Sequence, residues 1–240
     1  MKKEELIKRA VNPKQYDLTD LNFPDIGSAD SPFRVMVWDY IKALDIPFKG
    51  TSILDVGCGV GWLMKRMLDY EPSRVVGIEP ASKNCKVAGA ELPDAQVICS
   101  DLFSFQTEER FDFVFMILAS DYFEDLVPMF KKLRSFLNDG GKLITIDPDY
   151  EYNKTERCNY SLVVEPMSGD EYVVSVTRPS GTMVGFVRKN DYLLDRAREA
   201  GLVSVETREI QPTLNFLEAL PQYQGVRHLS IAQLNVFETK

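Results

Sequence analysis

Three glycines at alternate positions, Gly57, Gly59 and Gly61, follow a strand-like apolar run over residues 53–56. Such a loop lets main-chain amides come close to a ligand, because no side chain stands between them. A dinucleotide-binding Gly-x-Gly-x-x-Gly pattern would need a glycine at position 62, where the sequence has Trp62. The absence of that glycine counts against a bound pyrophosphate.

Acidic residues stand at the ends of three successive strand-like runs: Asp55, Glu79 and Asp101. A carboxylate at Asp55 repels phosphate, but it can order the loop or hold an ammonium group, directly or through water. Glu79 can accept both hydroxyls of a ribose, and Asp101 can accept from an adenine amino group. The three acids therefore predict one crevice for a zwitterionic, cationic cofactor rather than for NAD.

The elements that must position these residues follow an alternating pattern from residue 51 to about 148. Short β-branched runs alternate with segments of helical period, which predicts parallel strands joined by crossover helices. We expect strands over 52–56, 74–79, 96–100, 112–118 and 142–147, and helices over 62–70, 82–91 and 126–137. The glycine-containing segment 138–141 is expected to end the last of these helices.

The flanking segments complete the expected architecture. Residues 1–50 carry little strand signal and predict a helical cap, with one helix over 32–44. Runs over 160–165, 171–177 and 182–187 predict an antiparallel meander inserted at about 158–188 of a domain spanning 51–240. A helix over 190–200 and strands over 203–210 and 231–237 follow. The fold class is α/β: a doubly wound, mainly parallel seven-stranded sheet with a C-terminal antiparallel strand and an inserted β-meander.

The stretch 53–147 resembles the class I, Rossmann-like S-adenosylmethionine-dependent methyltransferases. The cofactor-binding residues that this resemblance implies are Asp55, Gly57, Cys58, Gly59 and Gly61 in the first motif, Glu79 and Pro80 at the ribose, Asp101 and Leu102 beside the adenine, and Met116 and Ile117 at the end of the fourth strand. Asp139 departs from the proline that the family commonly has before Gly-Gly. The resemblance covers roughly 51–148 and 183–238, and leaves 1–50, the meander and 211–229 to select the substrate.

Structural explanations compete with some of these assignments. Trp62, Met64 and Cys58 suit a hydrophobic core as well as a ligand site. Glu79 can be a solvated acid at a strand end, and Asp101 can be an ordinary turn residue at the start of a loop.

The acceptor side offers no single catalytic residue. Methyl transfer from a sulfonium is an in-line displacement, so alignment and exclusion of water supply much of the rate, and a base helps only an acceptor of high pKa. The candidate bases are Asp121, Tyr122, Asp147, Asp149, Tyr150 and His228. His228 is more typical of a surface turn, and Tyr122 stands where many family members carry histidine. Tyr16 and Arg34 of the cap are candidates to close over the cofactor, with Arg34 near its carboxylate.

Composition narrows the function classes. The 28 Lys plus Arg residues against 36 Asp plus Glu give a net charge of −8, which disfavours nucleic acid as a partner. The Asn/Asp-Pro-Pro-Tyr/Phe tetrapeptide of base-methylating enzymes is replaced by residues 118–121. Four scattered cysteines (58, 85, 99, 158), the lack of a metal-ligand pattern and the lack of a secretory or membrane segment predict a cytoplasmic protein without structural metal.

The sequence thus predicts methyl transfer from S-adenosylmethionine to a small molecule, at oxygen or nitrogen. The cap, the meander and 211–229 would form an apolar lid, with Phe216, Leu217, Leu220 and Tyr223 on the last segment. The structural alternative is that these side chains simply close the core. A non-catalytic S-adenosylmethionine-binding sensor or scaffold is an alternative, and an NAD-dependent oxidoreductase is a weaker one. The exposed strands of the meander also allow a homodimer.

Overall fold

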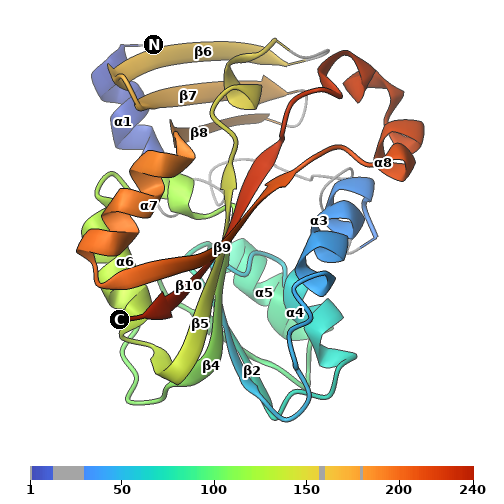
Figure 1. Ribbon diagram of the computed structural model, residues 1–240, viewed down its shortest axis with the longest axis vertical. Helices are drawn as coiled ribbons and strands as arrows, with labels where there is room; N and C mark the ends of the chain where they lie inside the picture. Colours follow the sequence, from blue (N-terminus) through green and yellow to red (C-terminus); the bar gives the residue numbers. More distant parts are fainter. Residues whose placement is uncertain (1, 13–29, 157–159, 179–180) are drawn as a thin grey trace.

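The computed structural model describes residues 2–12, 30–156, 160–178 and 181–240. Its centre is one seven-stranded sheet (Figure 1). The strands are β1 (Ser52–Val56), β2 (Arg74–Glu79), β3 (Gln96–Cys99), β4 (Phe111–Ile117), β5 (Leu137–Pro148), β9 (Leu202–Ile210) and β10 (Ala232–Thr239), in the order β3-β2-β1-β4-β5-β10-β9. The first five run parallel, and β10 is antiparallel to both β5 and β9. The predicted sheet with its C-terminal antiparallel strand is confirmed.

Alternating side chains bury both faces of this sheet, as parallel strands between two helical layers require. On one face, Ile53 and Phe115 pack with helices α3 (Pro32–Lys42) and α4 (Trp62–Leu68). On the other, Leu54 and Val114 pack with α6 (Leu126–Arg134) and α7 (Asn190–Glu199). Helix α5 (Ser82–Glu91) lies against β2 and β3. The strands are thereby held rigidly, with their carboxyl ends at one edge.

A separate antiparallel sheet lies beyond that edge, at the top of Figure 1. It consists of β6 (Ser161–Ser168), β7 (Glu171–Arg178) and β8 (Gly181–Arg188), and it confirms the predicted meander. Helix α1 (Lys3–Ala10) packs on β7 and β8, where Leu6 and Ala10 are fully buried against Val173 and Phe186. On its other side, β8 contacts the short 3-10 helix η1 (Ser120–Tyr122) that follows β4.

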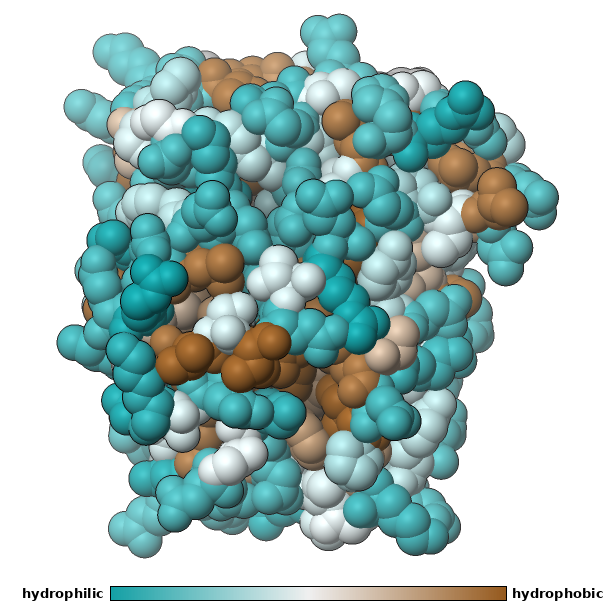
Figure 2. Space-filling model, viewed as in Figure 1, coloured by the Kyte–Doolittle hydropathy of each residue, from teal (hydrophilic) through white to brown (hydrophobic). Residues whose placement is uncertain are grey.

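The connection between β9 and β10 carries α8 (Leu214–Ala219) and η3 (Pro221–Val226), and η2 (Tyr152–Lys154) follows β5. Phe216 and Leu217 are buried and Leu220 and Tyr223 partly buried in the core beside α3, so these side chains close the core on this side. The surface in Figure 2 is mostly hydrophilic, with apolar side chains gathered over β9 and at α8. Val203, Val205 and Leu214 are among the exposed apolar residues there.

Two expectations about local structure were wrong. Helix α6 ends at Arg134 rather than at 137, with Ser135 as its C-cap. Residues 138–141 lie inside β5, where Gly140 adopts φ +76° and the pairing with β4 is irregular, so the glycines form a bulge and not a helix stop. The N-terminal segment also divides: α3 covers the central sheet, whereas α1 covers the meander. The proposed boundary near residue 50 stays a prediction.

Candidate functional site

The glycine loop between β1 and α4 requires glycine for its backbone path. Gly57, Gly59 and Gly61 adopt φ of +75°, +56° and +81°, the left-handed region that other residues rarely adopt. A Cβ on Gly57 would stand 2.8 Å from the Cβ of Ala119, and one on Gly61 would stand 2.5 Å from Leu92. A Cβ on Gly59, in contrast, has no described atom within 4 Å. The loop is therefore packed against neighbouring side chains at Gly57 and Gly61. It is unobstructed at Gly59, as a ligand-binding loop must be.

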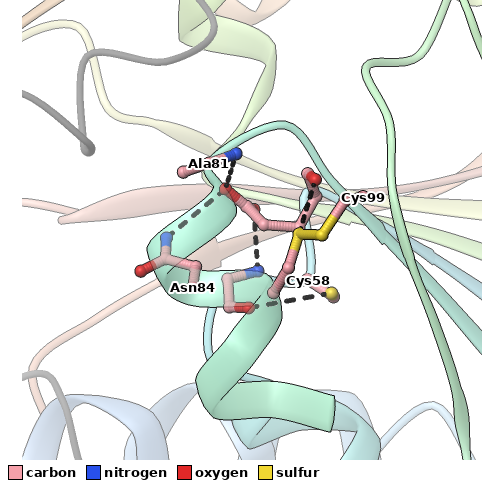
Figure 3. The surroundings of a disulfide bond; sticks show 7 residues. Cys58, Ala81, Asn84 and Cys99 are labelled. Carbon is pink, nitrogen blue, oxygen red and sulfur yellow. Dashed lines mark hydrogen bonds between the residues drawn. A yellow bond between two sulfur atoms is a disulfide. The ribbon is translucent and has the colours of Figure 1, made fainter.

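Glu79, at the end of β2, is tied to this loop (Figure 3). Its Oε2 accepts from the amide of Gly59 at 3.0 Å, and its Oε1 accepts from the amide of Ala81 at 3.0 Å and from Asn84 Nδ2 at 3.3 Å. The side chain is only 5% exposed. The alternative of a solvated strand-end acid is therefore wrong, because the carboxylate is buried and fixed in orientation.

Asp55, at the end of β1, is buried next to Glu79. Among the described residues its Oδ2 has no hydrogen-bond partner, although the side chain is only 2% exposed. Burial, and secondarily the neighbouring Glu79 charge, raise the pKa of Asp55 to about 7. Two carboxylates in one buried corner repel each other, and a cationic ligand would relieve that repulsion. The chemistry of this pair fits the ammonium of a zwitterionic cofactor and opposes a phosphate.

The remaining predicted cofactor residues fall into two groups. Asp101 and Pro80 are partly exposed near the ends of β3 and β2, and Asp101 Oδ1 accepts from the amides of Phe103 and Ser104 at 3.0 Å each. These hydrogen bonds hold the pKa of Asp101 below its ordinary value against a desolvation effect that raises it. Leu102 and Met116 are buried in the core facing α6, and Ile117 packs partly buried against the other core.

Cys58 is a core residue. It is 2% exposed, and its Sγ lies 2.8 Å from where a Cβ on Gly77 would stand. Burial raises the pKa of its thiol well above the ordinary value, so the side chain is not a nucleophile. Met64 is also fully buried, as its core interpretation predicts, and Trp62 is partly buried beneath Arg34.

A disulfide joins Cys85 of α5 to Cys99 of β3 (Figure 3), and Cys85 Sγ lies 3.0 Å from the main-chain oxygen of Glu79. The scattered positions of the cysteines along the chain do not indicate this pairing. Fourteen residues separate them, and only the packing of α5 on β3 brings the sulfurs together. In the described part of the chain, Cys58 is the remaining cysteine and is free; Cys158 lies outside it.

A second set of buried polar side chains follows the carboxyl ends of β4 and β5. Asp147, 5% exposed, accepts from the hydroxyl of Ser120 on one oxygen and from Thr145 Oγ1 at 2.6 Å on the other. Burial raises its pKa despite these hydrogen bonds. Asp147 thereby anchors η1 to β5, which makes it a positioning residue rather than a free base.

Asp121, the next residue in η1, has an Oδ1 that is buried and makes no hydrogen bond to any residue the structure describes. Burial is the main cause that raises the pKa of Asp121 to about 7; Asp147 adds to it, and the Arg188 charge opposes it. Of the candidate carboxylates, Asp121 is the one with a buried oxygen that no described residue hydrogen-bonds, although the residue as a whole is partly exposed.

The other acceptor-side candidates are placed differently. The carboxylate of Asp149 is already hydrogen-bonded, since it accepts from the amides of Glu151 and Tyr152 and from Gln233 Nε2. Tyr150 donates to the carbonyl of Gly169, on the meander, and packs against Tyr172. Tyr122 is partly buried in η1. His228 is exposed in the turn after η3, as expected for a surface residue.

Arg34 lies at the start of α3, with its guanidinium carbon 5.4 Å from the centre of the Trp62 ring. It is 9% exposed, and burial lowers its pKa to about 10, so it stays charged at neutral pH. Arg34 is therefore a cation beside the helix that follows the glycine loop. Tyr16 lies outside the described residues.

Sequence reasoning missed several site residues: Asn84, Ser120, Thr145, Gly185 and Arg188. Ser120 and Thr145 carry only a weak signal, which is their position at strand ends. Gly185 and Arg188 carry no signal in the sequence, because their contact with η1 depends on how the meander packs against the central sheet.

The described part of the chain contains no cluster of three or more potential metal ligands. Across the same residues, every helix is too short or too polar to be a bilayer-crossing segment.

Comparison with known proteins agrees with this geometry. Residues 54–145 match the model of a methyltransferase domain. A tRNA U34 carboxymethyltransferase from Campylobacter curvus is 26% identical over 173 residues, which are 68% of this chain and 57% of that protein. (S)-Coclaurine N-methyltransferase from Papaver somniferum is 24% identical over 56% of this chain and 38% of its own length. The chain thus spans less than two thirds of either relative.

Solved structures show the same fold. An S-adenosylmethionine-dependent methyltransferase from Mesorhizobium loti aligns with a TM-score of 0.66 at 19% identity, over 84% of this chain and 97% of that one. The glycopeptide N-methyltransferase MtfA, solved with S-adenosylmethionine, aligns at 0.62 and 16% identity, over 84% and 92%. The matched domain, the strand order and the acid-flanked glycine loop are those of the class I S-adenosylmethionine-dependent methyltransferases.

Proposed function

We propose that this protein transfers a methyl group from S-adenosylmethionine to a small-molecule acceptor, at oxygen or nitrogen. The observation that carries the proposal is the buried Asp55 and Glu79 pair beside a glycine loop that is open at Gly59. When bound, S-adenosylmethionine supplies a methyl group on a positively charged sulfur, which suits this anionic corner. The N-methyltransferase relatives support the same reaction class.

Each cofactor residue has a defined role in this proposal. Glu79 accepts the ribose hydroxyls, and its hydrogen bonds from Gly59, Ala81 and Asn84 fix the orientation of its carboxylate beforehand. Asp55 faces the ammonium group. Asp101 and Leu102 lie beside the adenine, while Met116 and Ile117 bring the end of β4 to the cofactor. Arg34 stands near the carboxylate of the methionine portion.

A small molecule is favoured over tRNA as the acceptor. The tRNA carboxymethyltransferase relatives favour nucleic acid, yet the net charge of −8 opposes a polyanion. The non-catalytic sensor or scaffold stays as the alternative, because no essential base is required for methyl transfer.

Calorimetric titration and product analysis test these proposals. We expect S-adenosylmethionine and S-adenosylhomocysteine to bind and NAD not to bind. S-Adenosylhomocysteine should form with a small-molecule extract and not with transfer RNA. Gly59→Arg should abolish both binding and turnover by filling the open side of the loop. Gly89→Arg, on α5 where a Cβ meets no described atom within 4 Å, is the matched control. Binding without turnover would favour the sensor.

Two further proposals concern the protein as a whole. We propose that β6, an outer strand of the meander, pairs with its counterpart in a homodimer; a monomeric mass at micromolar concentration would reject this. We also propose a cytoplasmic setting, although the Cys85–Cys99 disulfide is more typical of oxidising compartments. Fluorescent-fusion imaging together with thiol counting on freshly lysed cells tests it.

A further inference from the structure

The side chain of Asp121 packs directly against Gly185 of the meander. A Cβ on Gly185 of β8 would stand 2.9 Å from Asp121 Oδ2 and 3.2 Å from its Cβ. A side chain at position 185 would therefore have to displace this carboxylate. Sixty-four residues separate the two positions, so the contact exists because the meander folds over η1.

The carboxylate faces an apolar surface. Gly185 pairs with Val174, and the flanking pairs on the same face are Tyr172 with Val187 and Val176 with Met183. Tyr172, Val174, Val176 and Val187 are all buried, and Tyr150 and Tyr160 pack against them. The hydroxyls of Tyr160 and Tyr223 lie 3.0 Å apart, which joins this face to the β9–β10 connection. Asp121 thus packs at Gly185, on the strand face that carries these aromatic and aliphatic side chains.

The charges around Asp121 do not neutralise it through a direct bond. Arg188, on β8, hydrogen-bonds to other groups. Its Nε donates to Glu171 at 2.6 Å, and its Nη2 donates to the carbonyls of Phe123 and Glu124. Asp147, on β5, adds a second negative charge. Within the described residues, Oδ1 of Asp121 accepts no hydrogen bond. This buried oxygen therefore has no direct hydrogen-bond donor among the described residues, and Arg188 acts on it only through its nearby charge.

Asp121 also lies close to the cofactor loop. Ala119 packs on Gly57, and two residues of chain span at most about 7 Å. A group bound to the Asp121 carboxylate therefore stands beside the end of β4, where the methyl group would be presented.

We propose that Asp121 binds the basic nitrogen of the acceptor, and that the acceptor is an amine with an apolar body. This inference rests on the proposed methyltransferase function. An ammonium compensates the buried charge, whereas an alcohol supplies only a neutral donor and a carboxylic acid adds repulsion. The aromatic and aliphatic face of β7 and β8 receives the hydrocarbon part.

The reaction balances with this chain's own carboxylate as the proton acceptor. The bound ammonium gives one proton to Asp121. The freed nitrogen lone pair then forms a bond to the methyl carbon, while the carbon–sulfur bond breaks and leaves its electron pair on sulfur. The products are a methylated ammonium, S-adenosylhomocysteine and protonated Asp121, which returns its proton to solvent.

A matched acceptor library tests the proposal. Aryl-alkyl primary, secondary and tertiary amines, each with the alcohol and the carboxylate of the same skeleton, are incubated with protein and S-adenosylmethionine, and S-adenosylhomocysteine is measured. We expect turnover only with amines. Asp121→Asn should lower kcat/KM for amines by about 100-fold or more. The affinity for S-adenosylmethionine, measured by calorimetry, should not change.

Stability separates this role from a structural one. Asp121→Asn removes a buried charge, so its melting temperature at pH 8 should rise while amine turnover falls; a purely structural residue would lower both. Gly185→Ala should displace Asp121 and reduce turnover, whereas Gly169→Ala, at an open turn, should not. Faster turnover of alcohols or acids, no amine turnover despite cofactor binding, or full activity of Asp121→Asn would overturn the proposal. Failure to bind S-adenosylmethionine would instead reject the proposed function.

Discussion

The main-chain amide of Gly59 donates a hydrogen bond to Glu79 Oε2 across 3.0 Å, and so ties the glycine loop to the end of the second strand. Twenty residues separate the donor from the acceptor in the sequence. The same carboxylate that is proposed to hold the ribose therefore also holds the loop that approaches the rest of the cofactor.

Glu79→Gln should weaken S-adenosylmethionine binding by about 10- to 100-fold, since a charge-assisted hydrogen bond contributes about 1.5–3 kcal/mol. The amide oxygen can keep only part of the bonding to Gly59, Ala81 and Asn84. Isothermal titration measures the change. Glu91→Gln, an exposed residue at the end of α5, is the control and should bind normally. Equal affinity for both variants would show that Glu79 does not hold the cofactor.

Asp55 should make the stability of the ligand-free protein depend on pH. Its pKa rises from 3.8 to about 7 on folding, so the folded state binds more protons than the unfolded state between these values. Stability must therefore decrease as the pH rises from about 4 to 7. Thermal melting across this range should show the decrease, and Asp55→Asn should make it smaller; Asp121 accounts for a further part in the same direction. S-Adenosylmethionine should stabilise more at pH 8 than at pH 5.5, because ionised Asp55 meets its ammonium group. A pH-independent effect of the ligand would contradict this role.

Ser120→Ala should loosen the 3-10 helix that carries Asp121. The substitution removes a hydrogen bond to the buried Asp147 carboxylate, which contributes about 1.5–3 kcal/mol, or roughly 3–12 °C in melting temperature for a chain of this size. We expect kcat to fall and the affinity for S-adenosylmethionine to stay unchanged, because the glycine loop is not altered. Ser73→Ala, at an exposed position, is the control. A variant that melts and turns over like the control would show that Asp147 does not position η1.

Reduction of the Cys85–Cys99 disulfide should lower the melting temperature. A bridge that closes a loop of about 15 residues contributes about 3 kcal/mol, or roughly 6–12 °C here. The Cys85→Ser, Cys99→Ser double variant should melt at the lower temperature with or without dithiothreitol. If dithiothreitol shifts the double variant as much as the original chain, the effect comes from elsewhere.

The central fold could be predicted from the sequence because each of its signals is local. The ends of β1 and β2 and the bounds of α5 follow from runs of apolar residues and the residues that interrupt them. The pairing of Asp55 with Glu79 was also predictable, since parallel strands bring their carboxyl ends to one edge.

The acceptor side could not be predicted in the same way. Ser120 contacts Asp147 across 27 residues, and Asp121 meets Gly185 only because the meander turns back over β4. The glycines at 140 and 141 predicted the wrong end for α6 because the same residue type occurs both at helix ends and at strand bulges. Contacts set by tertiary packing leave no periodic trace in the chain.

The position of α1 has a consequence for the order in which the molecule forms. Arg9 donates to the carbonyl of Thr182, 173 residues later, and Leu6 is buried only once β8 is in place. During synthesis α1 must wait until β8 has been made, while the strands that hold the glycine loop can already pair. Closing so long a loop is slow, so the contact between α1 and the meander should form later than the pairing of β1 with β2 and should be among the first to open.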